Sequence, residues 1–318
     1  FPQLVAGPIE RAHRLLPQFH QSRKFDYGFA ASGAKLIVLG FFKKLVVADG
    51  ASVLVDMVYG NPSGFVGFPM LVATIFFTFQ IYGDFSGYTD IAIGAALILG
   101  FKIPKNFNKP YFAISPSDFW RRWHISLSSW LRDYLYIPLG GNKKSGSRTF
   151  ANLFIVMFLG GMWHGASWNF VIWGLLHGAY LAIHKMLKKA FPAFANNPFF
   201  KSRLGKITSI LITQYFVFLA WIPFRVHDTE HMLYSIQKFV IIDLQLDGAL
   251  DIILAHKIPI ALMVAFVILH YISYRKSNLI QTIANMKLRY WGIILGVILS
   301  LIIFFFDGNP EDFIYFRF

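Results

Sequence analysis

The sequence contains no cysteine, and charged residues make up only 14% of its 318 residues. The absence of cysteine excludes disulfide frameworks, thiolate zinc sites and cysteine nucleophiles. Acidic residues are scarce, with 16 Asp and Glu against 30 Lys and Arg, which gives a net charge of +14. Gly-x-Ser-x-Gly elbows, P-loops and dinucleotide fingerprints are also absent, so a serine hydrolase or a nucleotide-binding domain has no support.

Apolar residues are abundant instead, at 56% of the chain with 35 Phe. A soluble domain has about 45–50% apolar residues and about 25% charged ones, so this chain could not cover a water-exposed surface. Disorder is excluded because the chain has ample apolar surface to bury. The composition therefore predicts an all-α polytopic membrane protein. Since the chain begins with Phe1 and has no signal peptide, we expect residues 1–318 to be the C-terminal portion of a longer chain.

Several apolar runs are long enough to cross a bilayer. A further run, 150–187, is interrupted by Gly160, Gly161 and Gly165, which predicts two helices meeting at a break. Residues 30–48 are apolar but contain three lysines, so we expect a partly interfacial or re-entrant segment. The uninterrupted runs are residues 65–83, 204–224, 258–274 and 290–306.

The loops between these runs differ in charge. Residues 101–148 hold nine Lys and Arg, 185–206 hold six and 275–289 hold four. Residues 226–257 and the tail after residue 306 are acidic. Because loops rich in Lys and Arg stay in the cytoplasm, we expect the three basic segments on the cytoplasmic side of the membrane, and 226–257 and the C-terminus outside. The positive charge then needs no nucleic-acid partner.

Residues 115–134 have the pattern of an amphipathic helix. Ser115, Pro116 and Asp118 form a helix-start signal. Phe119, Trp123, Leu127, Trp130 and Tyr134 share one stripe, His124 lies at its border, and the other side carries Asp118, Arg121, Arg122 and Arg132. Two interpretations are open: an interfacial anchor without chemistry, or a helix whose arginines hold a phosphate-bearing donor.

His164 lies in the break, inside Trp163-His164-Gly165. Ionisable residues at membrane depth are costly and mark functional sites, and removal from water favours the neutral imidazole, which can act as a general base. The alternative is a packing histidine bonded to a carbonyl. His177 and His184 follow on one helix face and either line the same cavity or pack between helices.

Two further clusters have competing interpretations. Asp84 and Asp90 lie between apolar runs and either line a polar cavity or cap a helix after a break. His227, Glu230 and His231 match the inverted zinc-protease pattern, but no acidic third ligand is evident nearby. We expect a solvated loop there, and no metal site in the chain.

Six stretches together resemble the membrane-bound O-acyltransferase (MBOAT) family, in particular its bacterial alginate O-acetyltransferase type, with D-alanyl-lipoteichoic acid transfer proteins as further relatives. The resemblance covers nearly the whole chain. Its two longest stretches, residues 119–142 and 159–177, are highly specific. The stretches are FPQLVAGP (1–8), DFSGYTDIAIG (84–94), FKIPKNFNKPY (101–111), FWRRWHISLSSWLRDYLYIPLGGN (119–142), LGGMWHGASWNFVIWGLLH (159–177) and FIYFRF (313–318).

The resemblance implies that residues 1–318 form one domain in a bacterial inner membrane, a ring of tilted transmembrane and re-entrant helices around a central funnel. It also implies that the N-terminal spans of the family are missing from this chain. It implies that His164 is the family's essential histidine and His124 its second characteristic one. An acyl group, acetyl by default, would pass from a cytoplasmic thioester such as acetyl-CoA to a hydroxyl of a surface polysaccharide or of an extracytoplasmic relay protein. The donor is a substrate, and no cofactor is expected.

In this scheme His164 is the base, and His124 orients groups or stabilises the oxyanion. The alternatives are an acyl-relay channel that serves a separate extracellular transferase and, less favoured, a metalloprotease. Further candidates for lining the cavity or holding the donor are Trp163, Trp123, Arg121, Arg122, Arg132, Asp118, Asp84 and His177.

Overall fold

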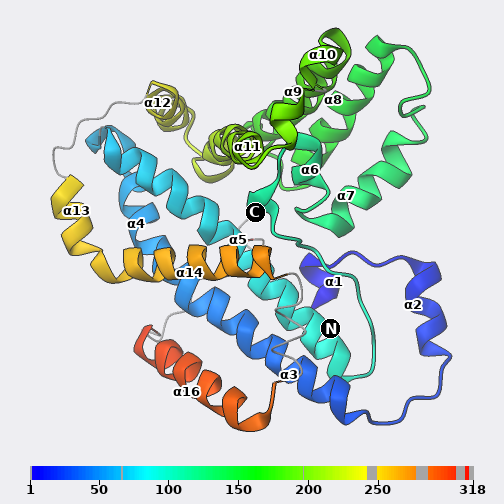
Figure 1. The fold of residues 1–318 in the computed structure, drawn as a ribbon, viewed down its shortest axis with the longest axis vertical. Helices are drawn as coiled ribbons and strands as arrows, with labels where there is room; N and C mark the ends of the chain where they lie inside the picture. Colours follow the sequence, from blue (N-terminus) through cyan, green and yellow to red (C-terminus); the bar gives the residue numbers. More distant parts are fainter. Residues whose placement is uncertain are drawn as a thin grey trace. The chain divides into compact units, whose positions relative to one another are not determined.

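The structure is a computed structural model that describes residues 2–65, 67–195, 197–241, 249–276, 286–305 and 312–314. Every regular element within these ranges is helical (Figure 1). The chain forms two compact units, one from Phe1–Asp56, Phe76–Asn106 and Gly248–Arg317, the other mainly from Met57–Ile75 and Phe107–Asp247. The all-helical expectation is thus confirmed for the described part of the chain.

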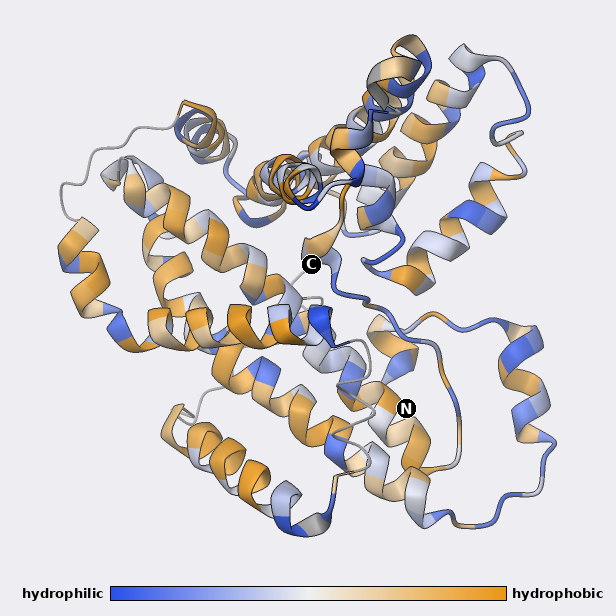
Figure 2. Ribbon diagram, viewed as in Figure 1, coloured by the Kyte–Doolittle hydropathy of each residue, from blue (hydrophilic) through white to orange (hydrophobic). Residues whose placement is uncertain are grey.

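Within the described ranges, four helices are long and apolar enough to cross a membrane. The predicted runs 65–83, 204–224 and 258–274 lie largely within three of them, and the run 290–306 falls mainly on the shorter apolar helix α16, Leu288–Phe305. Figure 2 shows α14 and α16 as predominantly hydrophobic. The four helices are α5 (Phe68–Ile98), α9 (Trp168–Ala190), α11 (Arg203–Arg225) and α14 (Lys257–Arg275).

In the first unit, the segment 30–48 is continuous helix. It comprises α3 (Tyr27–Phe41) and the π-helical turn η1 (Phe42–Ala48), and α4 (Asp49–Gly60) follows directly. The lysines of η1 are paired with acids: Lys43 Nζ lies 2.5 Å from Asp90 Oδ2, and Lys44 Nζ lies 3.0 Å from Asp84 Oδ1. These partners explain how an apolar helix accommodates its charges.

The expected helix break at residues 83–90 is wrong, because α5 runs without interruption from Phe68 to Ile98. Its glycines permit close packing instead of a turn. A Cβ on Gly87 would lie 2.7 Å from the carbonyl oxygen of Gly40, and one on Gly94 would lie 2.5 Å from that of Gly33. The backbones of α3 and α5 therefore approach too closely for any side chain at these positions.

Residues 312–314 are held against α5 and η1 within the first unit. Ile314 N donates to Asp84 Oδ2 at 2.8 Å, and Lys44 Nζ donates to the carbonyl oxygen of Asp312 at 3.3 Å. The ring of Phe313 lies 5.1 Å from that of Tyr88. The predictions for the tail and loops also fall on residues 242–248, 277–285, 306–311 and 315–318, which lie outside the described residues.

The second unit is centred on the helix pair α8 (Gly146–Met162) and α9. The predicted break between two helices is confirmed, with the connection at residues 163–167. A Cβ on Gly161 would lie 2.3 Å from the carbonyl oxygen of Phe170, and one on Gly174 would lie 2.3 Å from that of Met157. These glycines let the two backbones touch beside the connection.

Shorter helices complete the two units. In the first are α1 (Gln3–Ala6), α2 (Ala12–Phe19) and α13 (Ala249–Ala255); in the second are η2 (Pro62–Gly64), η3 (Pro110–Phe112), α6 (Pro116–Trp120), α7 (Ile125–Leu131), η4 (Arg132–Tyr136), α10 (Pro192–Ala195), η5 (Pro198–Lys201) and α12 (Thr229–Val240).

Candidate active site

The predicted amphipathic helix over residues 115–134 is wrong as a single helix. Its start is confirmed, since Ser115 Oγ accepts from Asp118 N at 3.2 Å. The helix then stops after Trp120, and α7 begins at Ile125. The break lies directly beside the most deeply buried residues of this segment, Trp123 and His124, which are only 1% and 3% exposed. Tertiary burial has overridden the local pattern.

His124 occupies the turn in a left-handed backbone conformation, with φ of 41°. This conformation costs about 1–3 kcal/mol for a non-glycine residue and clusters at functional sites. His124 immediately precedes α7 as its N-cap residue and is buried. The border position expected from the helical pattern is thus replaced by full burial.

His164 lies in the connection between α8 and α9 and is 6% exposed. Aromatic rings surround it: its ring centroid is 5.0 Å from that of Trp173, 5.2 Å from Phe224 and 6.2 Å from Phe170. The imidazole is therefore held in an apolar pocket formed by α9 and α11. Such a pocket both orients the ring and excludes water from it.

His124 and His164 lie outside the four candidate spans. Burial lowers the pKa of His164, and burial followed by the charge of His164 lowers the pKa of His124. Each histidine is therefore neutral at pH 7, and ionisation of one disfavours ionisation of the other. A neutral imidazole can take up a proton during a reaction.

Trp173 connects His164 to His177. Its ring centroid is 5.0 Å from each of the two imidazoles. The His177 ring stacks on Phe119 of α6 at 5.8 Å with an interplanar angle of 5°. Among the described residues, His177 Nε2 and Trp173 Nε1 are buried and have no hydrogen-bond partner. The cluster therefore contains an indole donor and an imidazole nitrogen that a bound polar molecule would satisfy.

Sequence reasoning missed Trp173, Trp221 and Phe224 as walls of this cluster. A signal for Trp173 was present in the sequence, because residues four apart, such as Trp173 and His177, share one helix face. Trp221 and Phe224 belong to α11, and Trp221 lies 4.9 Å from Trp123. No local pattern in the sequence indicates that α11 packs against the break.

The predicted cationic residues lie beside the turn. Asp118 Oδ2 is 3.0 Å from Arg122 Nε, and Asp118 Oδ1 is 3.7 Å from Arg121 Nη2. Arg132 pairs with Asp133 at 2.7 Å. The side chains of Arg121 and Arg132 are 72% and 62% exposed, whereas that of Arg122 is 25% exposed. Asp118 thus positions Arg121 and Arg122. The guanidinium groups of Arg121 and Arg132 remain accessible to a ligand.

Trp163 does not belong to the buried cluster, because it is 59% exposed. Consecutive residues at a helix end lie about 100° apart, so burial of His164 and exposure of Trp163 are compatible. Asp84 lies in the other compact unit, where it is paired with Lys44. Trp163 and Asp84, both predicted to line the cavity, therefore lie outside the buried cluster that contains His164.

The zinc-protease pattern does not form one helix face. Asp228 caps α12 by accepting from His231 N at 2.8 Å, so His227 precedes the helix and only His231 lies on it. No group of three potential metal ligands occurs among the residues that the structure describes. The geometry that makes His-x-x-Glu-His a metal motif is missing here. His184 is half-buried on α9, seven residues after His177.

The position of the break depends on Gly174. We expect Gly174→Ala to lower the thermal unfolding midpoint strongly, because its methyl group would meet the backbone of Met157 at 2.3 Å. Overpacking of this kind costs about 1–3 kcal/mol or more. Gly178→Ala on the same helix is the matched control, since its Cβ would meet the Phe154 side chain at 3.1 Å. If Gly174→Ala and Gly178→Ala had the same unfolding midpoint in detergent, the proposed packing role of Gly174 would be contradicted.

The fold and the site together define a multi-pass membrane protein with a histidine-containing aromatic core. The profile of the membrane-bound O-acyltransferase family matches residues 1–226. The chain belongs to the membrane-bound O-acyltransferase (MBOAT) family, as its resemblance to that family predicted.

Individual relatives support this assignment. Over 242 residues the chain is 41% identical to the peptidoglycan O-acetyltransferase of Helicobacter pylori, covering 76% of this chain and 45% of that protein. It is 47% identical over 189 residues to the probable alginate O-acetylase AlgI of Azotobacter vinelandii, covering 59% and 37%. It is 30% identical over 235 residues to the teichoic acid D-alanyltransferase of Bacillus subtilis, covering 68% and 57%. The chain therefore spans roughly 37–57% of the length of these relatives.

Proposed function

We propose that the chain carries the acyl-transfer centre of a membrane O-acyltransferase. It moves an acyl group, acetyl by default, from a thioester to a hydroxyl of an extracytoplasmic polysaccharide or of a relay protein. The observation that carries this proposal is the burial of two histidines, His124 and His164, in the aromatic core of a family member. The names of the relatives support acetyl or alanyl transfer to cell-surface polymers.

The proposed reaction begins with the acceptor hydroxyl. Neutral His164 takes the hydroxyl proton as the oxygen attacks the thioester carbonyl carbon, which forms a tetrahedral oxyanion. The oxyanion collapses, the carbon–sulfur bond breaks, and the leaving thiolate receives the proton from the imidazolium. His124 assists by orienting groups or by stabilising the oxyanion.

The indole N–H of Trp173 is proposed as a donor to the acyl oxygen. It is buried, has no partner among the described residues, and its ring contacts His164. We expect Trp173→Phe to lower the rate of transfer about 10²-fold, as the loss of an oxyanion donor does in other enzymes, with little change in thermal stability. Trp120→Phe is the control, because it also removes an unpaired indole N–H, from a ring 5.7 Å from Trp173. Equal losses of rate would contradict the assignment to Trp173.

The donor is proposed to be acetyl-CoA, approached from the cytoplasmic side. Arg121, Arg122 and Arg132 supply positive charge that suits its phosphates. The proposed orientation places residues 101–148, 185–206 and 275–289 in the cytoplasm of a bacterial inner membrane, and places 226–257 and the C-terminus outside. This arrangement lets a cytoplasmic acyl group modify a surface polymer.

The test uses the full-length protein in sealed vesicles with radiolabelled acetyl-CoA. Inside-out vesicles expose the cytoplasmic face to added donor, whereas right-side-out vesicles do not. We expect protein-dependent label on a polymer or partner only in inside-out vesicles. Label that requires a separate extracellular transferase would favour an acyl-relay channel, and label in right-side-out vesicles alone would contradict the orientation.

A further inference from the structure

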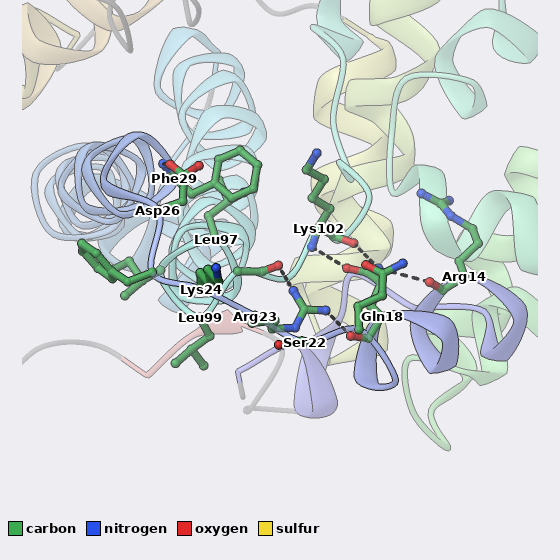
Figure 3. Close-up of a pocket in the computed structure, with 14 residues that line it drawn as sticks. Arg14, Gln18, Ser22, Arg23, Lys24, Asp26, Phe29, Leu97, Leu99 and Lys102 are labelled. Atoms are coloured by element: carbon green, nitrogen blue, oxygen red, sulfur yellow. Dashed lines mark hydrogen bonds between the residues drawn. The ribbon is translucent and has the colours of Figure 1, made fainter.

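A cavity of about 560 Å³ lies within the first unit, away from any residue assigned to acyl transfer. It is formed by α2, by the connection from α2 to α3, and by the residues that follow α5 (Figure 3). The lining residues are Arg14, Gln18, Gln21, Ser22, Arg23, Lys24, Phe25, Asp26, Phe29, Leu97, Ile98, Leu99, Gly100 and Lys102.

The cavity wall is built by specific polar contacts. Gln18 and Lys102 form a reciprocal pair, with Gln18 Nε2 donating to the carbonyl oxygen of Lys102 and Lys102 N donating to Gln18 Oε1, both at 2.9 Å. Arg23 donates to the carbonyl oxygens of Gly100 and Gln18 (Figure 3), and its guanidinium carbon lies 3.8 Å from the ring centroid of Phe101. These contacts fasten α2 to the end of α5 and fix the shape of the cavity.

The lining is strongly basic. Four of its residues, Arg14, Arg23, Lys24 and Lys102, carry positive charge, against the single carboxylate of Asp26. Asp26 Oδ1 accepts from Phe29 N at 2.9 Å and caps α3, so its charge already has a helix N-terminus as partner. The side chains of Arg14 and Lys24 are exposed. An anionic group in the cavity would therefore meet cations that have not been neutralised by neighbouring acids.

Exposed apolar side chains line the same cavity. Phe25 is 77% exposed, Leu99 54% and Ile98 40%. Beside them, Phe19 and Tyr27 are 57% and 75% exposed. Cations beside apolar surface match the two parts of a phospholipid, whose phosphate and acyl chains need opposite environments. A free nucleotide phosphate would leave this apolar surface in water.

We propose that this cavity binds the phosphate of an anionic glycerophospholipid, with the acyl chains lying over Phe25, Ile98 and Leu99. Basic pockets beside membrane helices on the cytoplasmic side are typical sites for such headgroups. The proposal is independent of the acyl-transfer chemistry, since no residue of the cavity belongs to the histidine cluster. It assigns α2 to the membrane interface, where its lipid contacts hold it against the end of α5.

The test measures lipid binding to the full-length protein in a neutral detergent by native mass spectrometry. Phosphatidylglycerol and cardiolipin are compared with zwitterionic phosphatidylcholine and with coenzyme A. We expect the two anionic lipids to bind more tightly than phosphatidylcholine. The R14Q/K24Q variant should bind them about thirtyfold more weakly, since each surface cation contributes about 1 kcal/mol.

The matched control is K143Q/K144Q, which removes two exposed lysines from a different loop. It should retain the affinity of the unaltered protein. Equal losses in both double variants would overturn the proposal, because binding would then reflect only the net charge of the chain. Displacement of the lipid by coenzyme A at lower concentration would also overturn it and assign the cavity to a soluble phosphate ligand. The comparison of lipids on the unaltered protein holds whether or not a variant folds.

Discussion

Replacement of His164 by alanine is expected to lower acyl transfer by about two to four orders of magnitude, the contribution that a positioned acid–base group makes. The substitution removes the proposed base from a pocket that Trp173 and Phe224 already shape. Folding should persist because those rings pack against other partners, Trp221 among them. The measurement is labelled acetyl transfer in inside-out vesicles, with protein amount and unfolding midpoint determined in parallel.

His231→Ala is the control for this prediction. His231 is only partly buried at the start of α12, where Asp228 forms the cap. We expect His231→Ala to transfer acetyl at the rate of the unaltered protein, which would also dispose of the zinc-protease pattern. Full activity of a folded His164→Ala protein would refute the proposed base. Chelator-sensitive activity lost in His231→Ala would point to metal chemistry instead.

Local sequence patterns predicted the membrane helices well. Spans such as α11 and α14 follow from long apolar runs with at most one charged residue, Lys206 in the case of α11, because a bilayer demands continuous hydrophobic length. The connection between α8 and α9 followed from three closely spaced glycines. Gly161, paired with Gly174 across that helix pair, lets the backbones meet. Both features depend on residues close together in the chain, which is why they can be predicted.

The failures arose where distant segments decide the structure. Residues 115–134 have a convincing helical period, but burial of Trp123 against Trp221 and the left-handed turn at His124 divide the helix. Asp84 and Asp90 suggested a helix cap after a break, but α5 is continuous there, and its Gly87 meets Gly40 of α3. The role of Asp84 was equally unpredictable, since its partners Lys44 and Ile314 lie far away in the sequence.

The ion pair of Asp84 leads to the second large effect, which concerns stability. Asp84 and Lys44 side chains are 2% and 4% exposed, and their charged atoms lie 3.0 Å apart. Removing one member of a buried pair leaves the other charge without full compensation, at a cost of about 3–5 kcal/mol. Asp84→Asn leaves Lys44 with Asp49 at 2.7 Å as its remaining carboxylate, so it should lower the free energy of unfolding by about 3 kcal/mol, the lower end of this range. It also removes the carboxylate that accepts from Ile314 N. Thermal unfolding in detergent, followed by size-exclusion chromatography, measures the change.

Asp90→Asn tests whether burial is the cause. Asp90 pairs with Lys43 at 2.5 Å, but their side chains are 21% and 23% exposed, so the remaining lysine is less completely enclosed by the protein. We expect a loss of about 1 kcal/mol or less for this partly exposed pair. The double variant D84N/K44M removes both charges of the Asp84–Lys44 pair. It also removes the partner of Asp49, but the side chain of Asp49 is 18% exposed and is therefore less buried than Asp84. The double variant should then lose less than the sum of the two single variants. Strict additivity, or equal losses in Asp84→Asn and Asp90→Asn, would show that the buried charge is not what holds this part of the first unit together.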